Sequence, residues 1–320
     1  MAFSATTNGA EIVAAFPAAV AGKTILITGP SIGSIGSETA ITLAGAPIPP
    51  AHILLAGRTI SKIQPVIDAI TAANPSIKTT FIALDLADLE SVRKAASEIA
   101  SAAPKLDILI NNAGIMAVKD YTVTAQGIES QFGVNWLGHF LLTGLLIKAG
   151  VVVKGETRIV NLTSMGFEIE GIRFDDYNFK EGATYNPWIA YGQSKTGNVL
   201  HAVGLTTRGF TAHAVHPGLI LDSHLLANVS QDMFADGFRI ATEANGGVPV
   251  SPETPKTLQQ GSSTTLVAAL SPDVVAFSGT LVRDCNVVKP EDTKVHARDP
   301  ALAEKLWALG EELTGEKFDF

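Results

Sequence analysis

Tyr191 and Lys195 stand four residues apart in the stretch YGQSK. In a helix this spacing places both side chains on one face, about one turn apart. Because a nearby ammonium group stabilises a phenolate, the spacing predicts that the pKa of Tyr191 is lowered from about 10 toward neutral. Such a phenol could donate a proton to a carbonyl oxygen or accept one from an alcohol. Taken alone, the spacing is also typical of an ordinary pair on a helix surface.

Polar residues upstream favour chemistry at this tyrosine. The apolar run RIVNLTSMGF predicts a strand that ends near Ser164, which places a hydroxyl at the carboxyl edge of a sheet, where ligands bind. The run LINNAG at 109–114 ends in small and amide residues, which could lie against a flat cofactor ring and its ribose. Asn135 is an amide within an apolar helical segment and needs a hydrogen-bond partner if buried. A structural and a functional role for Asn135 are both compatible with this pattern.

A glycine-rich turn follows the first apolar run of the chain. In TILITGPSIGSIGSETA, Gly29, Gly33 and Gly36 separate a predicted strand from a predicted helix. Glycines let the backbone turn tightly and approach a pyrophosphate, while a helix N-terminus supplies unpaired N–H groups. The pattern alone is equally compatible with a tight strand-to-helix connection. Its place on the first strand of a series of strands and helices favours a dinucleotide site.

The end of the second predicted strand favours NADP(H) over NAD(H). A site for NAD usually has an acidic residue about 20 residues beyond the glycines, where it binds the ribose hydroxyls. This sequence reads LLAGRTISK there, with Arg58 at that position and Lys62 one helical turn later. Two cations could neutralise a 2′-phosphate. The alternative is that Arg58 is an ordinary solvated turn residue.

The elements that must position these residues alternate along the chain, which predicts an α/β fold. Short β-branched runs and longer helical patterns predict a doubly wound, parallel, seven-stranded sheet with helices on both faces. The predicted strands are residues 23–28, 52–57, 78–84, 106–111, 157–163, 211–216 and 279–284. The predicted helices are residues 38–45, 60–74, 89–102, 127–149 and 189–207.

The whole chain, 1–320, is predicted to be a single domain. Residues 1–20 form an N-terminal extension that lacks the basic start of a secretory signal. Residues 219–275 break the alternation, with Gly/Pro-rich segments that predict a substrate lid between the last two strands. Residues 299–315 have the apolar spacing of a C-terminal helix.

Composition excludes several classes of protein. With 46% hydrophobic and 17% charged residues, the chain has enough apolar side chains for a large core. Its formal net charge of −8 disfavours nucleic acid and anionic membrane surfaces as partners. The most apolar window, 134–147, is too short to span a bilayer. One cysteine, Cys285, excludes an intrachain disulfide and a thiolate metal cluster, and it favours a reducing, cytoplasmic compartment.

A metal site is not expected. His213 and His216 lie three apart on a predicted strand, so their side chains should point to opposite faces, and the sequence places no carboxylate beside them.

Taken together, the motifs resemble those of the short-chain dehydrogenase/reductase family, whose domain is a Rossmann fold. The matching features are the glycine turn, NNAG, the asparagine of VNWLGHF, the serine after IVNLT, and YGQSK, in the family's order. The segments LAGR, GIRFDDYNF, AYGQSKTGNVL, HPGLI and AEKLW are similar to the retinol-dehydrogenase-like and WW-domain-oxidoreductase-like branch, especially its fungal members. The resemblance spans residues 20–318.

The resemblance implies an oxidoreductase that transfers a hydride between NADP(H) and a carbonyl/alcohol pair. Tyr191 would be the general acid/base, and Lys195 would lower its pKa and hold the nicotinamide ribose. Ser164 would hydrogen-bond the substrate oxygen, and Asn135 would hold a water that links Lys195 to solvent. The expected substrate is a lipophilic small molecule, for example a fungal secondary metabolite.

The resemblance also implies a set of cofactor-binding residues. The pyrophosphate and adenosine would lie against the glycine turn, and the 2′-phosphate would lie against the arginine that follows the second strand. The full implied set, with the two residues shared with catalysis, is Gly29, Ser31, Gly33, Gly36, Arg58, Asp85, Leu86, Asn112, Ala113, Gly114, Tyr191, Lys195, Pro217 and Gly218. Family members form homodimers or homotetramers through helices at about 127–149 and 189–207, with a monomer as the alternative.

Two departures from the family pattern leave alternatives open. The turn TGPSIGSIG is one residue longer than the commonest form and has Ser34 where the longer fungal form usually has glycine. After HPG, Asp222 or Ser223 takes the place of the usual threonine that contacts the carboxamide. A redox-silent NADP-binding module or non-redox catalyst is therefore a second hypothesis, and an NAD-linked alcohol dehydrogenase is a third.

Overall fold

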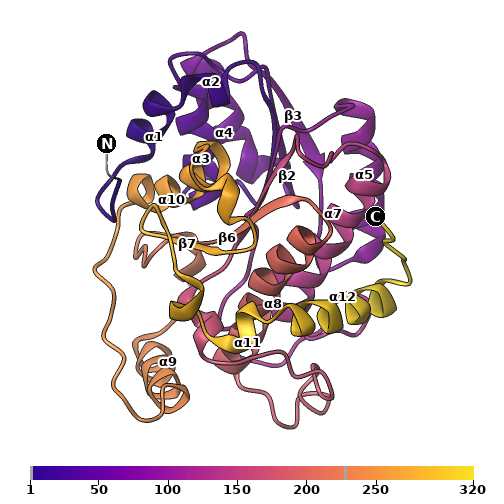
Figure 1. The fold of residues 1–320 in the computed structure, drawn as a ribbon, viewed down its shortest axis with the longest axis vertical. Helices are drawn as coiled ribbons and strands as arrows, with labels where there is room; N and C mark the ends of the chain where they lie inside the picture. The colour runs from indigo at the N-terminus through magenta and orange to yellow at the C-terminus, as the bar shows by residue number, and fades with distance from the viewer. Residues whose placement is uncertain (1–2, 227–228) are drawn as a thin grey trace.

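The fold is built on one mainly parallel sheet. The computed structural model describes residues 3–226 and 229–320, and in these residues eight strands are ordered β3-β2-β1-β4-β5-β6-β7-β8 (Figure 1). The first seven strands are parallel, and β8 is antiparallel to β7. Their bounds are β1 (Thr24–Thr28), β2 (His52–Gly57), β3 (Lys78–Ala83), β4 (Ile108–Asn111), β5 (Arg158–Leu162), β6 (Thr211–His216), β7 (Leu281–Arg283) and β8 (Asn286–Val287).

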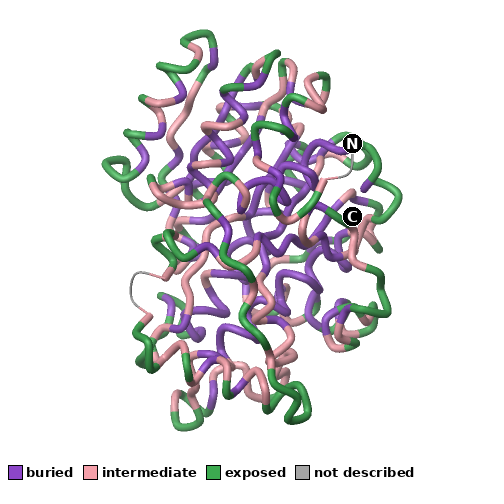
Figure 2. The backbone as a smooth tube through the Cα atoms, turned by 90° about the vertical axis from the view of Figure 1, so that its left-hand side faces the viewer, coloured by how far each residue is buried: buried purple, intermediate pink, exposed green. Residues whose placement is uncertain are grey.

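Helices cover both faces of this sheet, which confirms the predicted α/β class. Alternate residues of β1 enter different cores: Ile25 and Ile27 pack into one and Leu26 into the other, and all three are fully buried. One face is covered by α3 (Ile35–Ala44), α4 (Ile60–Ala73) and α10 (Leu258–Leu270), and the other by α5 (Leu89–Ala102), α7 (Gly138–Lys148) and α8 (Pro187–Thr207). Figure 2 shows buried backbone running through the middle of the molecule and exposed backbone at its ends.

The strand count corrects the prediction of seven. The predicted last strand, 279–284, stops at Arg283, and the chain then reverses into β8. Asp284 and Cys285 both have positive φ angles, of 51° and 64°. Two successive residues in the left-handed region form the kind of tight turn that joins antiparallel strands, so β7 and β8 form a short hairpin at the sheet edge.

The region predicted as a lid, 219–275, divides into two structurally different parts. Helix α9 (Gln231–Ala244) projects from the body of the molecule (Figure 1), whereas α10 packs against α3, β5 and β6. Residues 261–270 of α10 are all buried. The lid prediction is therefore too long, because α10 belongs to the layer that covers the sheet, and only the segment before it is free to border a ligand.

The N-terminal extension contains structure that the sequence pattern did not indicate. Helices α1 (Gly9–Ala15) and α2 (Pro17–Val20) lie within it, and α1 packs across α10 and α3. Ile12 is fully buried, and a Cβ on Gly9 would lie 2.6 Å from Ser262 Oγ. Glycine at this position therefore permits the close crossing of α1 and α10.

The C-terminal segment covers the opposite helical layer. Helix α12 (Pro300–Thr314), preceded by α11 (Val295–Arg298), packs on α8 and also contacts α7. The backbone leaves α12 at Gly315, which has a φ of 68°. Subunits that paired through α7 and α8, as the family resemblance implies, would have to accommodate α12 on that face.

In the part of the chain that is described, no helix has the length and apolar character needed to cross a membrane.

Buried histidines predict that acid destabilises the fold. Burial lowers the pKa of His201 from 6.5 to about 3, and it lowers the pKa values of His139 and His213 to about 4. The unfolded chain then binds more protons than the folded one below pH 6.5, so stability is full above that pH and is lost as the pH falls toward 4. At pH 5, His201 alone should cost about 2 kcal/mol of unfolding free energy.

Urea denaturation at pH 7 and pH 5 measures this effect. The variant His201→Leu should lose about 2 kcal/mol less than the wild type between the two pH values. The matched control is His224→Leu, at an exposed residue, which should follow the wild type. An unchanged pH dependence in His201→Leu would contradict the proposed titration.

Candidate active site

A single large cavity lies at the carboxyl ends of the parallel strands. Its volume is about 1240 Å³, and its walls come from the glycine turn, the ends of β2 to β7, and α9. Most of the predicted site residues line it, from the glycine turn at Gly29 to Pro217 and Gly218 after β6. Gly33, Gly36 and Asn135 do not line the cavity directly. The predicted residues that do line the cavity come from seven segments of the chain. They converge on the sheet edge where ligands bind in such folds.

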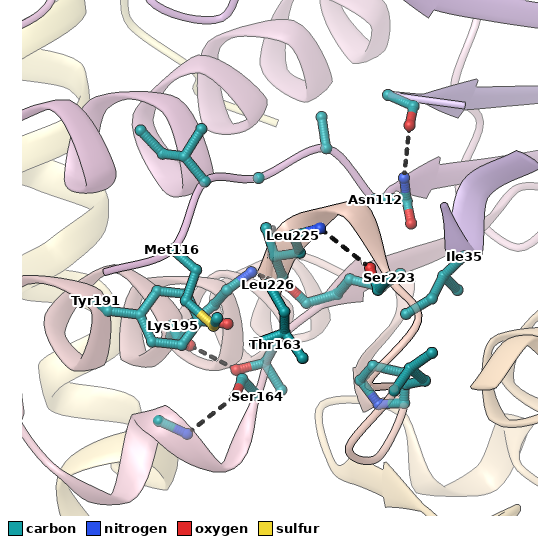
Figure 3. A pocket seen from close by; sticks show the side chains of 18 of the residues that line it. Ile35, Asn112, Met116, Thr163, Ser164, Tyr191, Lys195, Ser223, Leu225 and Leu226 are labelled. Atoms are coloured by element: carbon teal, nitrogen blue, oxygen red, sulfur yellow. Dashed lines mark hydrogen bonds between the residues drawn. The ribbon is translucent and has the colours of Figure 1, made fainter. Parts of the chain in front are cut away.

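Tyr191, Lys195 and Ser164 meet in this cavity (Figure 3). Tyr191 is 3% exposed and Lys195 is 4% exposed, both on α8. Lys195 Nζ lies 5.6 Å from the centre of the Tyr191 ring and donates a hydrogen bond to the Leu162 carbonyl at 3.2 Å. Ser164 lies beside the Tyr191 ring: a Cβ on Gly166 would lie 2.8 Å from Tyr191 Cδ1 and 3.6 Å from Ser164 Oγ. The helix and the end of β5 thus bring a phenol, an amine and an alcohol together.

The pKa of Tyr191 shifts in the direction opposite to the prediction. Burial raises it to about 12, and the hydrogen bond from Ser164 only partly offsets this. Burial also lowers the pKa of Lys195 to about 8. Burial disfavours the charged form of each group, the phenolate of Tyr191 and the ammonium ion of Lys195. In this protein Tyr191 is therefore a phenol throughout the physiological pH range.

Ser164 is positioned by a short helical turn after β5. It caps η2 (Met165–Glu168), a 3-10 helix, and its Oγ accepts a hydrogen bond from the Gly166 N–H at 3.2 Å. Gly166 lies flat against the Tyr191 ring, since a Cβ there would lie 2.8 Å from Cδ1 and Cε1 of the tyrosine. The absence of a side chain at residue 166 lets the serine and the tyrosine approach.

Asn135 lies behind the cavity wall, within the π-helix η1 (Gly133–Leu137). Its Oδ1 accepts a hydrogen bond from the Ile115 N–H at 2.8 Å, and its Nδ2 donates to the Ile115 carbonyl and to Ser194 Oγ, both at 2.9 Å. A Cβ on Gly114 would lie 3.1 Å from Asn135 Oδ1 and 3.4 Å from Lys195 Nζ. The buried amide thus has a protein partner for its oxygen and for both of its N–H bonds, and it holds the wall next to the lysine.

The glycine turn has the conformation that the sequence pattern predicts. Gly29 and Gly33 have φ angles of 67° and 77°, which favour glycine, and a Cβ on Gly36 would lie 2.5 Å from Asn112 Nδ2. Ser34 caps α3: its Oγ accepts a hydrogen bond from the Ser37 N–H at 3.1 Å. The predicted helix therefore starts earlier than residue 38, at Ile35, and the departure at Ser34 has a structural role.

Arg58 and Lys62 both border the end of the cavity nearest the glycine turn, close to Ser31. Both side chains are exposed, and neither makes a side-chain hydrogen bond or an ion pair with another described residue. Arg58 follows β2 directly, as predicted, and Asp85 and Leu86 follow β3 on the same side of the site. At this end of the cavity, Arg58 and Lys62 are two cations that form no ion pair with a carboxylate among the described residues.

The loop after β6 covers part of the same turn. Gly218 has a φ of 97°, and the chain then passes over the glycine turn, where the His224 N–H donates to the Gly33 carbonyl at 3.4 Å. Ser223 lines the cavity, together with Leu225 (Figure 3), whereas Asp222 is exposed and does not. Of these two residues, only Ser223 is therefore placed to contact a ligand in the cavity.

Comparisons with known proteins agree with this geometry. A family model for short chain dehydrogenase matches residues 23–178. Oxidoreductase fscI of Fusarium equiseti is 36% identical over 247 residues, which cover 68% of this chain and 94% of that protein. Retinol dehydrogenase 12 of Mus musculus is 35% identical over 309 residues, which cover 94% of this chain and 89% of that protein. The chain belongs to the short-chain dehydrogenase/reductase family.

Solved structures support the same assignment. A crystal structure of an uncharacterized protein from Mycobacterium paratuberculosis superposes with a TM-score of 0.67 at 31% identity, covering 94% of this chain and 96% of its own. A short chain dehydrogenase from Burkholderia cenocepacia in complex with NADP shares the fold, with a TM-score of 0.61 at 22% identity over 82% of this chain and 96% of its own. This family member is therefore an oxidoreductase of the Rossmann type, and a nicotinamide coenzyme fits its family.

One buried network in this short-chain dehydrogenase was missed by the sequence analysis. His139 Nδ1 donates to the Asn135 carbonyl at 3.0 Å, so its Nε2 is the acceptor for the Thr28 hydroxyl at 2.8 Å. Thr28 Oγ1 in turn accepts hydrogen bonds from the N–H groups of Asn112 and Ala113, at 2.9 and 3.0 Å. The network joins η1 to the ends of β1 and β4. The only signal in the sequence was a histidine inside an apolar helix.

Replacement of His139 should therefore destabilise the protein strongly. In His139→Leu the Thr28 hydroxyl and the Asn135 carbonyl lose their partner while remaining buried, which should cost roughly 2–4 kcal/mol of unfolding free energy. Urea denaturation at pH 7 measures the loss. His52→Leu, which removes a single partly buried bond to Thr80, is the control and should lose less. Equal losses in the two variants would argue against the network.

The structure corrects one statement about the histidines of β6. Both His213 and His216 are buried, and His216 Nε2 lies 2.8 Å from Glu253 Oε2, so a carboxylate does accompany it. Glu253 lies in the loop before α10, far from β6 in the sequence, so no local pattern could reveal it. Among the residues described, no group of three or more metal-ligating side chains occurs.

Proposed function

We propose that this family member is an NADP(H)-dependent reductase that interconverts a carbonyl and an alcohol on a lipophilic small molecule. The observation that carries this proposal is the convergence of Ser164, Tyr191 and Lys195 in one cavity that also reaches Arg58 and the glycine turn. Relatives that are named oxidoreductase and retinol dehydrogenase support the same reaction class.

The chain's own residues suit proton transfer to a carbonyl oxygen. Tyr191 is protonated at neutral pH, because its pKa is about 12, and in the reductive direction it would donate that proton to the oxygen. Ser164, which lies beside Tyr191, would donate to the same oxygen and fix its position. Lys195, as an ammonium ion, would stabilise the phenolate that remains. Asn135 holds the neighbouring wall and would order a water for return of the proton.

The residues at the other end of the cavity fit a dinucleotide with a 2′-phosphate. Gly29 and Gly36 leave no room for side chains, so backbone N–H groups at the start of α3 are open to a pyrophosphate. Arg58 and Lys62 would bind the 2′-phosphate, and Asp85 the adenine side, with Leu86 next to it. Residues 112–114 would form the central wall, and Pro217 and Gly218 would cover the nicotinamide. When bound, NADPH supplies the hydride.

The alternative of a redox-silent module rested on two departures from the family pattern. Ser34 caps α3 and also donates to the Gly29 carbonyl within the turn at 3.3 Å, and Ser223 supplies a hydroxyl to the cavity wall. Neither departure now argues against coenzyme binding, which favours the reductase.

The test follows NADPH oxidation by absorbance across a panel of aromatic ketones and aliphatic aldehydes. We expect turnover of at least one lipophilic carbonyl compound with NADPH and slower turnover with NADH. Tight NADPH binding without oxidation across the panel would instead support the redox-silent module, and a preference for NADH would favour the NAD-linked alternative.

A further inference from the structure

The substrate end of the cavity is not uniformly apolar. Its walls near Tyr191 include Met116, Ile169, Trp188 and Phe234, which suit a lipophilic body. Beyond them lies a group of charged side chains, here termed the charged end, which consists of Glu168, Glu253, Arg283 and Lys294. A ligand that entered with only a hydrocarbon tail would bury these groups without any hydrogen bond in exchange, which is costly.

Two members of the charged end are already paired. Arg283 donates to Glu253, whose other oxygen lies 2.8 Å from His216 Nε2, and Arg283 also approaches Met165 Sδ at 3.6 Å. This pair ties the loop before α10 to the ends of β6 and β7. Arg283 and Glu253 therefore have fixed partners and a structural role.

Glu168 and Lys294 are not paired in this way. The half-buried Glu168 carboxylate makes no hydrogen bond and no ion pair with any residue that the structure describes. Lys294 Nζ has one long contact, 3.4 Å, to Asn245 Oδ1. Because it is partly buried, the Glu168 carboxylate lacks the hydration that an exposed acid has, and this raises its pKa. An acceptor and a donor thus face the cavity with bonding capacity left over.

Glu168 also lies at a defined distance from the reacting end. It is the last residue of η2, the 3-10 helix that Ser164 caps. Because a 3-10 helix rises about 2 Å per residue, the backbone positions of Ser164 and Glu168 are separated by roughly 8 Å along the helix. A group bound by Glu168 would therefore lie about one aromatic ring away from the carbonyl oxygen held by Ser164.

We propose that Glu168 and Lys294 bind a hydroxyl group of the substrate remote from its carbonyl, so that the substrate class is a hydroxylated aromatic ketone rather than a plain hydrocarbon aldehyde. This inference rests on the function proposed above. A hydroxyl donates to Glu168 and accepts from Lys294, which uses both free groups at once. A charged ligand fits less well, because the charged end holds two acids and two bases and their charges balance.

The experiment compares three probes of one skeleton: benzophenone, para-hydroxybenzophenone and para-methoxybenzophenone. Binding to the NADPH-loaded protein is measured by calorimetry, and turnover is measured by NADPH oxidation. The wild type should bind the hydroxyl compound at least tenfold more tightly than the methoxy compound, because a hydrogen bond to a charged group is lost in the latter. The variant Glu168→Leu should abolish that preference, because the acceptor for the hydroxyl group is gone.

Glu170→Leu is the matched control, because Glu170 lies two residues away and does not line the cavity. It should keep the hydroxyl preference, and Lys294→Leu should reduce it. If the wild type bound all three probes with the same affinity, or bound none of them, the inference would be overturned, even if the protein reduced other carbonyl compounds. A hydroxyl preference in binding that depends on Glu168, without any NADPH oxidation, would support the charged end and reject the proposed reductase.

Discussion

Tyr191→Phe should reduce carbonyl reduction by about 10²–10⁴-fold, because the phenolic proton is the acid that the proposed reaction needs. The Tyr191 ring is buried and packs against Gly166, and a phenylalanine ring would keep the same burial and packing. We therefore expect NADPH binding, measured by fluorescence titration, and the thermal midpoint to change little. The loss should appear in kcat, since the interaction with the oxygen is made most strongly in the transition state.

Tyr177→Phe is the matched control for this variant. Tyr177 stacks on Phe132 with ring centres 6.1 Å apart, and it does not line the cavity. The control should keep wild-type turnover. If Tyr191→Phe retained more than about a tenth of the wild-type kcat, another group would have to supply the proton, and the proposed mechanism would be wrong.

Arg58→Ala should weaken NADPH binding about 10–100-fold and leave NADH binding within about threefold, because only NADPH carries the 2′-phosphate. Arg58 is exposed and has no protein partner among the described residues, so its removal should not perturb the fold. The double variant with Lys62→Ala should lose the remaining preference for NADPH. Dissociation constants for both coenzymes, measured at one ionic strength, provide the comparison.

Arg239→Ala serves as the control, since Arg239 is a surface arginine of α9 outside the cavity. It should bind both coenzymes as the wild type does. A wild type that binds NADH as tightly as NADPH, or an Arg58→Ala variant that retains its preference, would contradict the assignment of Arg58.

Local patterns in the sequence predicted seven of the eight strands, and together with the family resemblance they indicated residues that border the cavity. The apolar runs became β1 to β7 with changes of at most two residues at either end, because strands buried on both faces require continuous apolar sequence. The glycines at 29 and 36 could be recognised because no other residue permits such close approach of the backbone. Helical periodicity places Tyr191 and Lys195 on one face, and the polar residues at the neighbouring strand ends indicated that this face is a site.

Other features depend on contacts between distant parts of the chain. The pKa of Tyr191 rises because burial outweighs the effect of Ser164, and the depth of burial is a property of the packed fold. The pairing of His216 with Glu253 joins residues 37 apart, and the network from His139 to Thr28 spans 111 residues. The sequence by itself therefore determined seven strands, the helices between them, and the candidate catalytic groups that they carry to the sheet edge. Only the tertiary structure decided how those groups are desolvated and paired, because both depend on neighbours that no local pattern encodes.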